Sequence, residues 1–412
     1  MNCKPLLFWQ NPREMLRLLQ IIAFCWLAIA GTAAERPLIL AHYMPWYETK
    51  AVSGQWGWHW TMNKFQPDKV TDGRRELASH YRPLIGAYDS NDPHALECHA
   101  LLMKFAGIDG AILDWYGIRK HNDYAMIHRN SLHFVKHLKR AGLKFAVCYE
   151  DQSVKHMING NALPAAQAVP HGREVMRWLQ ANWFRDAAYV KTGGRPVLLV
   201  FGPQHFTAAQ WPQLTLGLQP PPATFALPHL TKQLPGSNAF GWPPVHGGKR
   251  VAPADWNRYL NDLDQRAAKG EAIIAPVFPK FHDIYKEAGL HDSYGYLDDQ
   301  KGQTFEQTLD RALRGKSRII QIATWNDYGE GTIIEPTKDF GYRYLESLQR
   351  RRAKVDPAFR HTPWDLRLPV MLYLLRKRDA TLAPRLNAIA QLLHTNRTAE
   401  AKAQLTALWG RN

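Results

Sequence analysis

Cysteine is scarce in this sequence. The 412 residues include 4 Cys, far fewer than a small secreted fold that depends on disulfide bonds would carry. No Cys-x-x-Cys or His-Glu-x-x-His segment occurs, and the 18 His residues have no metal-ligand spacing, so the sequence predicts neither a metal site nor an organic cofactor. Cys98 and Cys148, which follow the N-terminal segment, could pair in an oxidising compartment, but the sequence favours two buried free thiols.

Long hydrophobic runs are also missing. The most apolar stretch, residues 18–30, has thirteen residues, whereas a helix that crosses a bilayer needs about 20. Basic residues, among them Arg13 and Arg17, precede this stretch and the small residues 31–34 follow it, which is typical of a secretory signal peptide. We therefore predict a signal peptide over residues 1–34, export to the periplasm or the extracellular space, and no stable membrane insertion afterwards. An uncleaved anchor is the alternative.

Acidic residues are outnumbered. There are 36 Asp and Glu against 52 Lys and Arg, which gives a net charge of +16 and a pI near 9.6. Such a charge permits binding to nucleic acids, acidic polymers or anionic surfaces. However, the basic residues are spread along the chain, with only short runs such as 350–352. The pattern therefore favours a solvated basic surface and predicts no nucleic-acid partner.

Eight short apolar runs alternate with amphipathic segments of helical length. Strands of a parallel sheet that is covered on both faces are typically continuous apolar runs, and eight β/α units close into a barrel. A doubly wound open sheet is the alternative, but no Gly-x-Gly-x-x-Gly follows the first run. We predict an α/β protein with a (β/α)8 TIM barrel. The predicted strands cover residues 38–43, 108–114, 143–149, 196–201, 223–227, 238–242, 272–278 and 318–325.

Helix signals lie between these runs. Asp92 followed by Pro93 is typical of a helix start, and Gly107 of a helix end. Beyond about residue 354 only helical patterns remain. We predict a barrel over 35–354 and a small all-helical C-terminal extension over 355–412. The main predicted barrel helices cover residues 94–105, 126–140, 172–184 and 303–315.

Three unusually long connections follow predicted strands directly. They cover residues 44–91, 150–170 and 202–256, and such a position places them at the C-terminal face of a barrel. Barrel enzymes carry their active sites on that face.

Two carboxylates follow the last predicted strand. Asp327 and Glu330 are three residues apart, and a turn at Tyr328 and Gly329 brings both side chains to one side. At the mouth of an aromatic-rich barrel, such a pair suits cleavage of a glycosidic bond, because one carboxyl protonates the leaving oxygen while the other acts on the opposite face. An ordinary solvated turn is the alternative. The flanking Trp325 and Asn326 favour the catalytic interpretation.

The surrounding motifs resemble those of glycoside hydrolase families 71 and 99. Family 71 contains fungal endo-α-1,3-glucanases, and family 99 contains endo-α-mannosidases and endo-α-1,2-mannanases. The resemblance covers about residues 36–346 in order, and implies a (β/α)8 barrel in which Asp327 and Glu330 are catalytic, with Glu330 as the general acid. Family 99 has Glu where this chain has Asp327. The similar segments are 325–330, close to family 71, then 331–336, closer to family 99, and 41–47, 82–89 and 110–116.

Aromatic and polar residues near the strand ends are candidates for substrate binding. Sugar rings present apolar C–H faces that pack on aromatic planes, and their hydroxyls need planar polar partners. The alternative for the aromatic residues of the first long connection is a small packed core. We interpret His42 and Glu335 as structural, and Asp114 could instead cap a loop. The predicted substrate-binding residues are Tyr43, Trp46, Tyr47, Trp58, Asp114, Trp115, Tyr116, Glu150, Trp325 and Asn326.

The sequence therefore predicts an exported, endo-acting α-glycoside hydrolase without metal or cofactor. Its expected substrate is an α-linked polysaccharide, either an α-glucan or an α-mannan. Two alternatives come from other functional classes. One is a non-catalytic carbohydrate-binding barrel, and the other is a relative of the glycosyltransferases that take part in polysaccharide synthesis.

Overall fold

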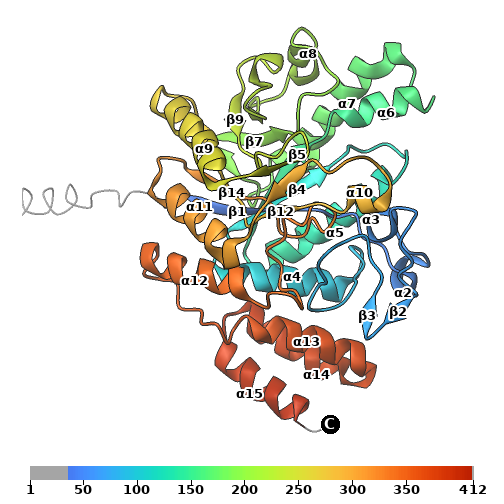
Figure 1. Cartoon of the computed structure of the whole chain (residues 1–412), viewed down its shortest axis with the longest axis vertical. Helices are drawn as coiled ribbons and strands as arrows, with labels where there is room; N and C mark the ends of the chain where they lie inside the picture. The colour runs from blue at the N-terminus through green and yellow to red at the C-terminus, as the bar shows by residue number, and fades with distance from the viewer. Residues whose placement is uncertain (1–35, 411–412) are drawn as a thin grey trace, which may run out of the picture. The chain divides into compact units, whose positions relative to one another are not determined.

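The protein is a closed barrel of eight parallel strands surrounded by helices (Figure 1). A computed structural model describes residues 36–410, and the predicted signal peptide over 1–34 lies outside this range. The sheet order is β5-β4-β1-β14-β11-β9-β8-β7, and pairing of β5 with β7 closes the barrel. The barrel strands are β1 (Leu38–Tyr43), β4 (Gly110–Trp115), β5 (Lys144–Tyr149), β7 (Arg195–Val200), β8 (Ala223–Ala226), β9 (Asn238–Phe240), β11 (Ile273–Val277) and β14 (Ile319–Ile322).

Each predicted strand is found in the structure, which confirms the predicted fold class. The runs form strands because both faces of the sheet are buried, one by the surrounding helices and the other by the barrel interior. Leu40, Ile112, Leu199, Phe225 and Ile274 belong to the interior cluster. Parallel pairing in continuous register, for example Gly110–Trp115 with Lys144–Tyr149, leaves few ladder groups unpaired.

The helices around the barrel begin and end close to the predicted positions. In α4, Asp92 Oδ1 accepts a hydrogen bond from the His94 amide at 3.0 Å, and Gly107 ends the helix in a left-handed conformation. Between β8 and β9 the described chain has only a 3-10 turn, Thr231–Gln233. The helices before residue 356 are α2 (Lys50–Ser53), α3 (Trp58–Thr61), α4 (Pro93–Ala106), α5 (Tyr124–Arg140), α6 (Gln152–Asn159), α7 (Ala168–Leu179), α8 (Trp211–Thr215), α9 (Pro253–Ala268), α10 (Tyr285–Ala288), α11 (Gln303–Arg314) and α12 (Arg343–Val355).

Short strands outside the barrel shape the long connections. Strands β10 and β12 both pair with β13, which places the connection after β9 beside the connection after β11. The remaining two-residue strands form hairpins, β2 with β3 and β6 with β7. These strands are β2 (Val70–Thr71), β3 (Arg74–Arg75), β6 (Lys191–Thr192), β10 (Lys249–Val251), β12 (Phe281–His282) and β13 (Gly295–Leu297).

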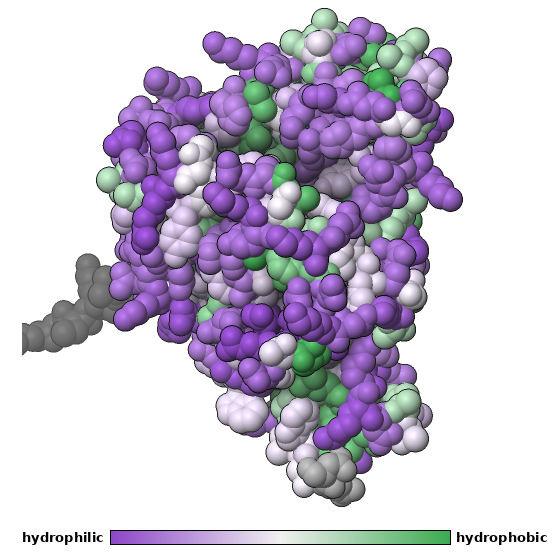
Figure 2. Space-filling view, turned by 45° about the vertical axis from the view of Figure 1, so that its right-hand side comes forward, coloured by the Kyte–Doolittle hydropathy of each residue, from purple (hydrophilic) through white to green (hydrophobic). Residues whose placement is uncertain are grey.

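The C-terminal extension consists of α13 (Arg367–Arg378), α14 (Ala383–His394) and α15 (Thr398–Trp409). Helix α13 packs against α4 of the barrel, and the chain from Pro37 onward forms one compact unit. Figure 2 shows a largely hydrophilic face with apolar residues gathered at its lower end, over these helices. In residues 36–410, no helix has the length and apolar character that a membrane span requires.

Cys98 and Cys148 are both free and buried, as the sequence favours. Cys98 lies in α4, while Cys148 lies in β5 among the side chains that fill the barrel. Neither thiol therefore takes part in a disulfide bond that would stabilise the fold.

Candidate active site

A cavity of about 350 Å³ opens at the C-terminal ends of the barrel strands. The residues that line it come from the ends of seven of the eight barrel strands and from the connections that follow them. Its lining includes four carboxylates and several aromatic rings, and no Lys or Arg of the described chain contributes to it. The lining residues are His42, Met44, Trp46, Asp114, Tyr116, Glu150, Gln152, Phe201, Gln204, Trp242, Pro243, Val245, Phe281, Tyr285, Tyr294, Asp327 and Glu330.

A hydrogen-bonded loop after β14 presents Asp327 and Glu330 to this cavity. The Asp327 amide donates to Thr324 Oγ1 at 2.8 Å, and the Glu330 amide donates to Asp327 Oδ1 at 2.9 Å. The His282 amide donates to the Glu330 carbonyl at 2.9 Å, which ties this loop to the connection after β11. These bonds form the expected turn, so both carboxylates face the same space.

Gly331 permits a close approach within this loop. Its φ is +67°, and a Cβ at this position would lie 2.5 Å from the His282 carbonyl oxygen. Any other residue would therefore separate the two connections that hold Glu330 in place.

The four carboxylates of the cavity have raised pKa values. Burial and the charge of Asp327 raise the pKa of Glu330 well above its ordinary value. Burial also raises the pKa of Asp327 to about 6, although backbone amides of residues 329 and 330 oppose the shift. Asp114 and Glu150 are shifted upward by burial and by their acidic neighbours. Burial and acidic neighbours therefore favour the protonated forms of Asp114, Glu150 and Glu330.

His42 lies beneath Asp114 as a neutral imidazole. Gln321 Nε2 donates to the Gly241 carbonyl at 3.0 Å, so its Oε1 faces His42 Nδ1 at 3.4 Å. This orients the other ring nitrogen toward Asp114 Oδ1, 3.7 Å away. Burial lowers the pKa of His42 to about 4.

His42, Asp114 and Cys148 are the described residues that could hold a metal ion, with ligand atoms within 4.8 Å of one another. Metal binding would require the Cys148 thiolate. Burial raises the pKa of this thiol well above its ordinary value, and the charge of Asp114 raises it further. The chemistry of this donor set therefore opposes metal binding.

A second cavity of about 590 Å³ continues from the first and is rich in aromatic rings. Tyr116, Glu150 and Gln152 line both cavities. Trp58, His59, Tyr124 and His156 contribute the remaining rings. Trp46 of the first cavity stacks on His59 with ring centroids 4.1 Å apart, so an aromatic surface runs from one cavity into the other.

The structure brings together six of the twelve predicted site residues in the carboxylate cavity and a seventh, Trp58, in the aromatic one. The six are Trp46, Asp114, Tyr116, Glu150, Asp327 and Glu330. The first long connection supplies Trp46 and Trp58, and Tyr116 directly follows β4. Asp114 and Glu150 lie at the ends of β4 and β5, whereas Asp327 and Glu330 lie in the loop after β14.

The other five predicted binding residues do not line either cavity. Tyr43 stacks on Phe134 of α5, and Trp115 lies beside Trp178 of α7. Neighbouring residues on a strand point to opposite faces, so these two rings face the helices while His42 and Asp114 face the barrel mouth. Tyr47, Trp325 and Asn326 are buried as well.

Asn326 has a structural contact that explains its position. Its Oδ1 accepts from the Met44 amide at 2.8 Å and its Nδ2 donates to the Met44 carbonyl at 2.9 Å. The Tyr47 hydroxyl donates to the Asn326 carbonyl at 2.8 Å. These bonds hold the carboxylate loop against the first long connection. The predicted contact of Asn326 with substrate stays a prediction.

Several lining residues were not predicted, among them Trp242, Tyr285, Tyr294, Gln152 and Gln204. Trp242 and Gln152 could have been found, because each lies within three residues of a strand end. Tyr285 and Tyr294 reach the cavity through the connection after β11, and no periodic pattern in the sequence indicates that path.

Known proteins with similar sequences match only parts of this chain. The family model described as Glycosyltransferase WbsX matches residues 249–348. An uncharacterized protein named WxcX, from Xanthomonas campestris pv. campestris, is 24% identical over 201 residues, 41% of this chain and 28% of that protein. An ascus wall endo-1,3-alpha-glucanase of Schizosaccharomyces pombe is 25% identical over 135 residues, 33% of this chain and 29% of that protein. The chain thus spans less than a third of the length of these relatives.

A solved structure matches most of the chain. The GH99 endo-alpha-mannosidase of Bacteroides thetaiotaomicron superimposes with a TM-score of 0.58 at 18% sequence identity, over 78% of this chain and 98% of that one. This similarity identifies the fold as that of the endo-mannosidase barrel. With the glucanase match, it confirms the predicted resemblance to families 71 and 99.

Proposed function

We propose that the protein is an endo-acting α-glycoside hydrolase that cleaves an α-linked polysaccharide, with Glu330 as general acid and Asp327 as general base. The observation that supports this most is the meeting of Asp327 and Glu330 in one cavity that lacks lysine and arginine. A non-catalytic carbohydrate-binding barrel would not need two carboxylates with raised pKa values at that position.

The proposed reaction uses both protonation states. Glu330, kept protonated by burial and by the charge of Asp327, donates its proton to the glycosidic oxygen as the C–O bond breaks. Asp327, ionised above its pKa of about 6, removes a proton from a water molecule that attacks the anomeric carbon. The products are two shorter sugars, and the two carboxyl groups have exchanged their protonation states until solvent restores them.

Export and the sugar class are part of the same proposal. The signal-peptide pattern over residues 1–34 supports a location outside the cytoplasm, where polymeric substrates occur. The glucanase and mannosidase similarities support α-glucans and α-mannans as the first substrates to examine.

Sugar transfer from a nucleotide donor is a second candidate, favoured by the match of residues 249–348 to the Glycosyltransferase WbsX model. Such a donor carries a diphosphate, which typically binds cations or backbone amides. The carboxylate cavity would repel it. If purified protein consumed nucleotide sugars and released no oligosaccharide from polymers, the hydrolase proposal would be wrong.

The experiment that tests the proposal is a screen of α-linked glucans and mannans for new reducing ends. An endo-acting hydrolase should also lower polymer viscosity early, before much sugar has been released. Release of monosaccharides alone, with viscosity unchanged, would contradict endo action.

The pH dependence of kcat/KM should be bell-shaped, with its acidic limb near pH 6. Activity should rise as Asp327 ionises and fall where Glu330 loses its proton at higher pH.

Asp283 raises the pKa of both groups by its charge, and its Oδ2 accepts a hydrogen bond from the Tyr294 amide at 2.8 Å. Asp283→Asn keeps an oxygen for that bond and removes the charge, so both limbs should shift to lower pH.

The control for this shift is Asp292→Asn, an exposed carboxylate on the same connection that pairs with Lys286. Its profile should match that of the wild type. An Asp283→Asn profile with unmoved limbs would contradict the electrostatic coupling of these three carboxylates.

Trp58→Ala should weaken substrate binding with little effect on thermal stability. The Trp58 side chain is 40% exposed in the aromatic cavity, and loss of a sugar contact on such a ring costs about 1 kcal/mol, which corresponds to a KM about fivefold higher. Trp60 is fully buried and donates to the Tyr88 carbonyl at 2.9 Å. Trp60→Ala should instead cost about 3–5 kcal/mol of stability. Early melting of the Trp58 variant with unchanged KM would indicate a packing role.

The reaction should invert the anomeric configuration. Asp327 is one methylene shorter than the Glu of family 99, which leaves space for water between the base and the sugar. Inverting enzymes separate their carboxyl groups by about 6.5–9.5 Å, compared with about 5–5.5 Å in retaining enzymes. Proton NMR of the first product from an α-linked substrate should therefore show the β-anomer, and an α-anomer would refute inversion.

A further inference from the structure

A third cavity, of about 920 Å³, adjoins the carboxylate cavity through residues other than those that the aromatic cavity shares with it. Phe201, Trp242, Pro243 and Val245 line both spaces. Because Tyr116, Glu150 and Gln152 likewise connect the aromatic cavity to the central one, the three spaces form one continuous groove. Asp327 and Glu330 lie in its middle.

The charged residues of this groove are segregated. The aromatic and central cavities contain Asp123 and the four site carboxylates, and no Lys or Arg of the described chain lines them. Every Lys and Arg that lines the groove lies in the third cavity, beside two acidic residues, Asp255 and Asp262. These basic residues are Lys249, Arg250, Arg258 and Arg266.

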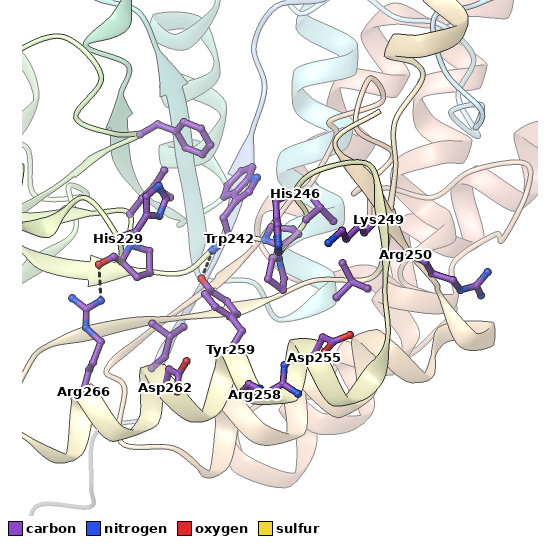
Figure 3. A pocket seen from close by; sticks show the side chains of 18 residues that line it. His229, Trp242, His246, Lys249, Arg250, Asp255, Arg258, Tyr259, Asp262 and Arg266 are labelled. Atoms are coloured by element: carbon purple, nitrogen blue, oxygen red, sulfur yellow. Dashed lines mark hydrogen bonds and ion pairs between the residues drawn. The ribbon is translucent and has the colours of Figure 1, made fainter. Parts of the chain in front are cut away.

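The four basic side chains differ in how strongly they are already engaged. Arg266 binds both carboxylate oxygens of Glu271 at 2.6 Å and also donates to the Pro228 carbonyl. Its guanidinium is therefore already occupied by contacts within the protein. Arg250 pairs with Asp298 and points away from the cavity (Figure 3). Arg258 pairs with Asp255, and both side chains are largely exposed. Exposed pairs of this kind are weak and exchange readily.

Among the four basic residues that line the third cavity, Lys249 is the one best placed to bind an anionic ligand. Its side chain is exposed, has no ion-pair partner in the described chain, and extends toward His246 (Figure 3). His246 is exposed near Lys249, and His229 is exposed at the other end of the cavity (Figure 3). Asp255, the nearest competing acid on α9, also accepts the Ala252 amide at the helix start.

We propose that the substrate is an acidic polysaccharide and that the third cavity binds its anionic sugar through Lys249. The inference rests on the proposed hydrolase function and specifies its substrate class. Repulsion supports it as much as attraction does, because a carboxylate or phosphate substituent in the central or aromatic cavity would meet acidic side chains and no Lys or Arg of the described chain. An acidic repeating polymer therefore binds in one register, and the cut falls at a fixed place relative to its charged sugar.

The test measures binding separately from cleavage. Oligomers of α-1,4-galacturonan and their methyl esters share the sugar and the linkage and differ in the free carboxylate, while phosphomannan and its dephosphorylated form differ in the phosphate. Wild-type protein should bind at least one acidic ligand at least about tenfold more tightly than its neutral partner. This preference should shrink as salt rises above about 0.15 M, because exposed charges are then screened within about 8 Å.

Lys249→Glu should reduce acidic-ligand affinity about tenfold and leave neutral-ligand affinity unchanged. The matched control is Lys354→Glu, which changes the net charge equally. Lys354 lies at the end of α12, two residues from Arg352, whose contact with Asp109 places it at the N-terminal ends of the strands, away from the groove. The control should bind acidic ligands as the wild type does.

Three results would overturn the inference. They are equal binding of acidic and neutral ligands, equal losses in the two charge-reversal variants, and tighter binding of single-stranded DNA or a nucleotide sugar than of any acidic glycan. Failure of the hydrolase proposal would be visible as Lys249-dependent binding of an acidic glycan with no reducing ends released. Cleavage of neutral polymers with no preference for charge would refute the acidic substrate alone.

Discussion

Asp327→Asn and Glu330→Gln should each reduce kcat on a polysaccharide substrate by about 10²–10⁴ while leaving the fold intact. Each change is nearly isosteric. The Glu330 amide can still donate to the side-chain oxygen at position 327, as it does now at 2.9 Å. What is lost is the ability to remove a proton at residue 327 and to donate one at residue 330.

A substrate with a more acidic leaving group distinguishes the general acid from the general base. An aryl α-glycoside with a strongly acidic phenol needs little protonation to depart, so Glu330→Gln should regain much of its activity on it. Asp327→Asn should remain impaired on both substrates, because attack by water still needs a base. Equal recovery of both variants would contradict the assignment of acid and base. Glu48→Gln, on the first connection outside the carboxylate cavity, serves as the control.

Glu97→Gln should lower the free energy of unfolding by about 3–5 kcal/mol, because it leaves the buried guanidinium of Arg376 without its counter-charge. The Glu97 carboxylate is 3% exposed and binds Arg140 at 3.0 Å, Arg376 at 3.0 Å and His394 at 3.3 Å. These partners belong to α5, α13 and the end of α14. One carboxylate thus joins the C-terminal extension to the barrel.

Denaturant unfolding at neutral pH measures this loss, and Glu400→Gln provides the comparison. Glu400 pairs with Arg397 on the surface of α15, so its replacement should change stability little. Burial opposes ionisation of Glu97, but His394 and the two arginines outweigh it and lower its pKa. Its contribution should therefore be full above the unfolded value and disappear as pH falls through the lowered folded value. Equal stability of the two variants would show that Glu97 does not anchor the extension.

The barrel was predictable because its strands have no solvent-facing side. Leu38–Tyr43 and Ile319–Ile322 are buried almost throughout, so each is a continuous apolar run that composition alone reveals. The turn that unites Asp327 and Glu330 was predictable from Gly329 and from its place after the last strand. The same reasoning gives no account of the path by which residues 285–294 reach the site.

Strand geometry explains why two of the predicted binding residues, Tyr43 and Trp115, do not line the cavities. Strand side chains alternate between the barrel and the helices, so Tyr43, Trp115 and Tyr149 face outward while their neighbours His42, Asp114 and Glu150 face the mouth. Aromatic character favours both burial and sugar contact, and only this alternation separates the two roles. Exposure separates Trp58 from Trp60 in the same way.

The most direct test of the central claim compares wild-type protein with the double variant Asp327→Asn, Glu330→Gln on the α-linked polysaccharide that the screen identifies. The measurement is the rate at which new reducing ends appear, with both proteins shown by melting to be folded. The wild type should release oligosaccharides of several lengths, and the double variant should release none above the uncatalysed background. A double variant that cleaves at the wild-type rate would show that these carboxylates do not perform the reaction.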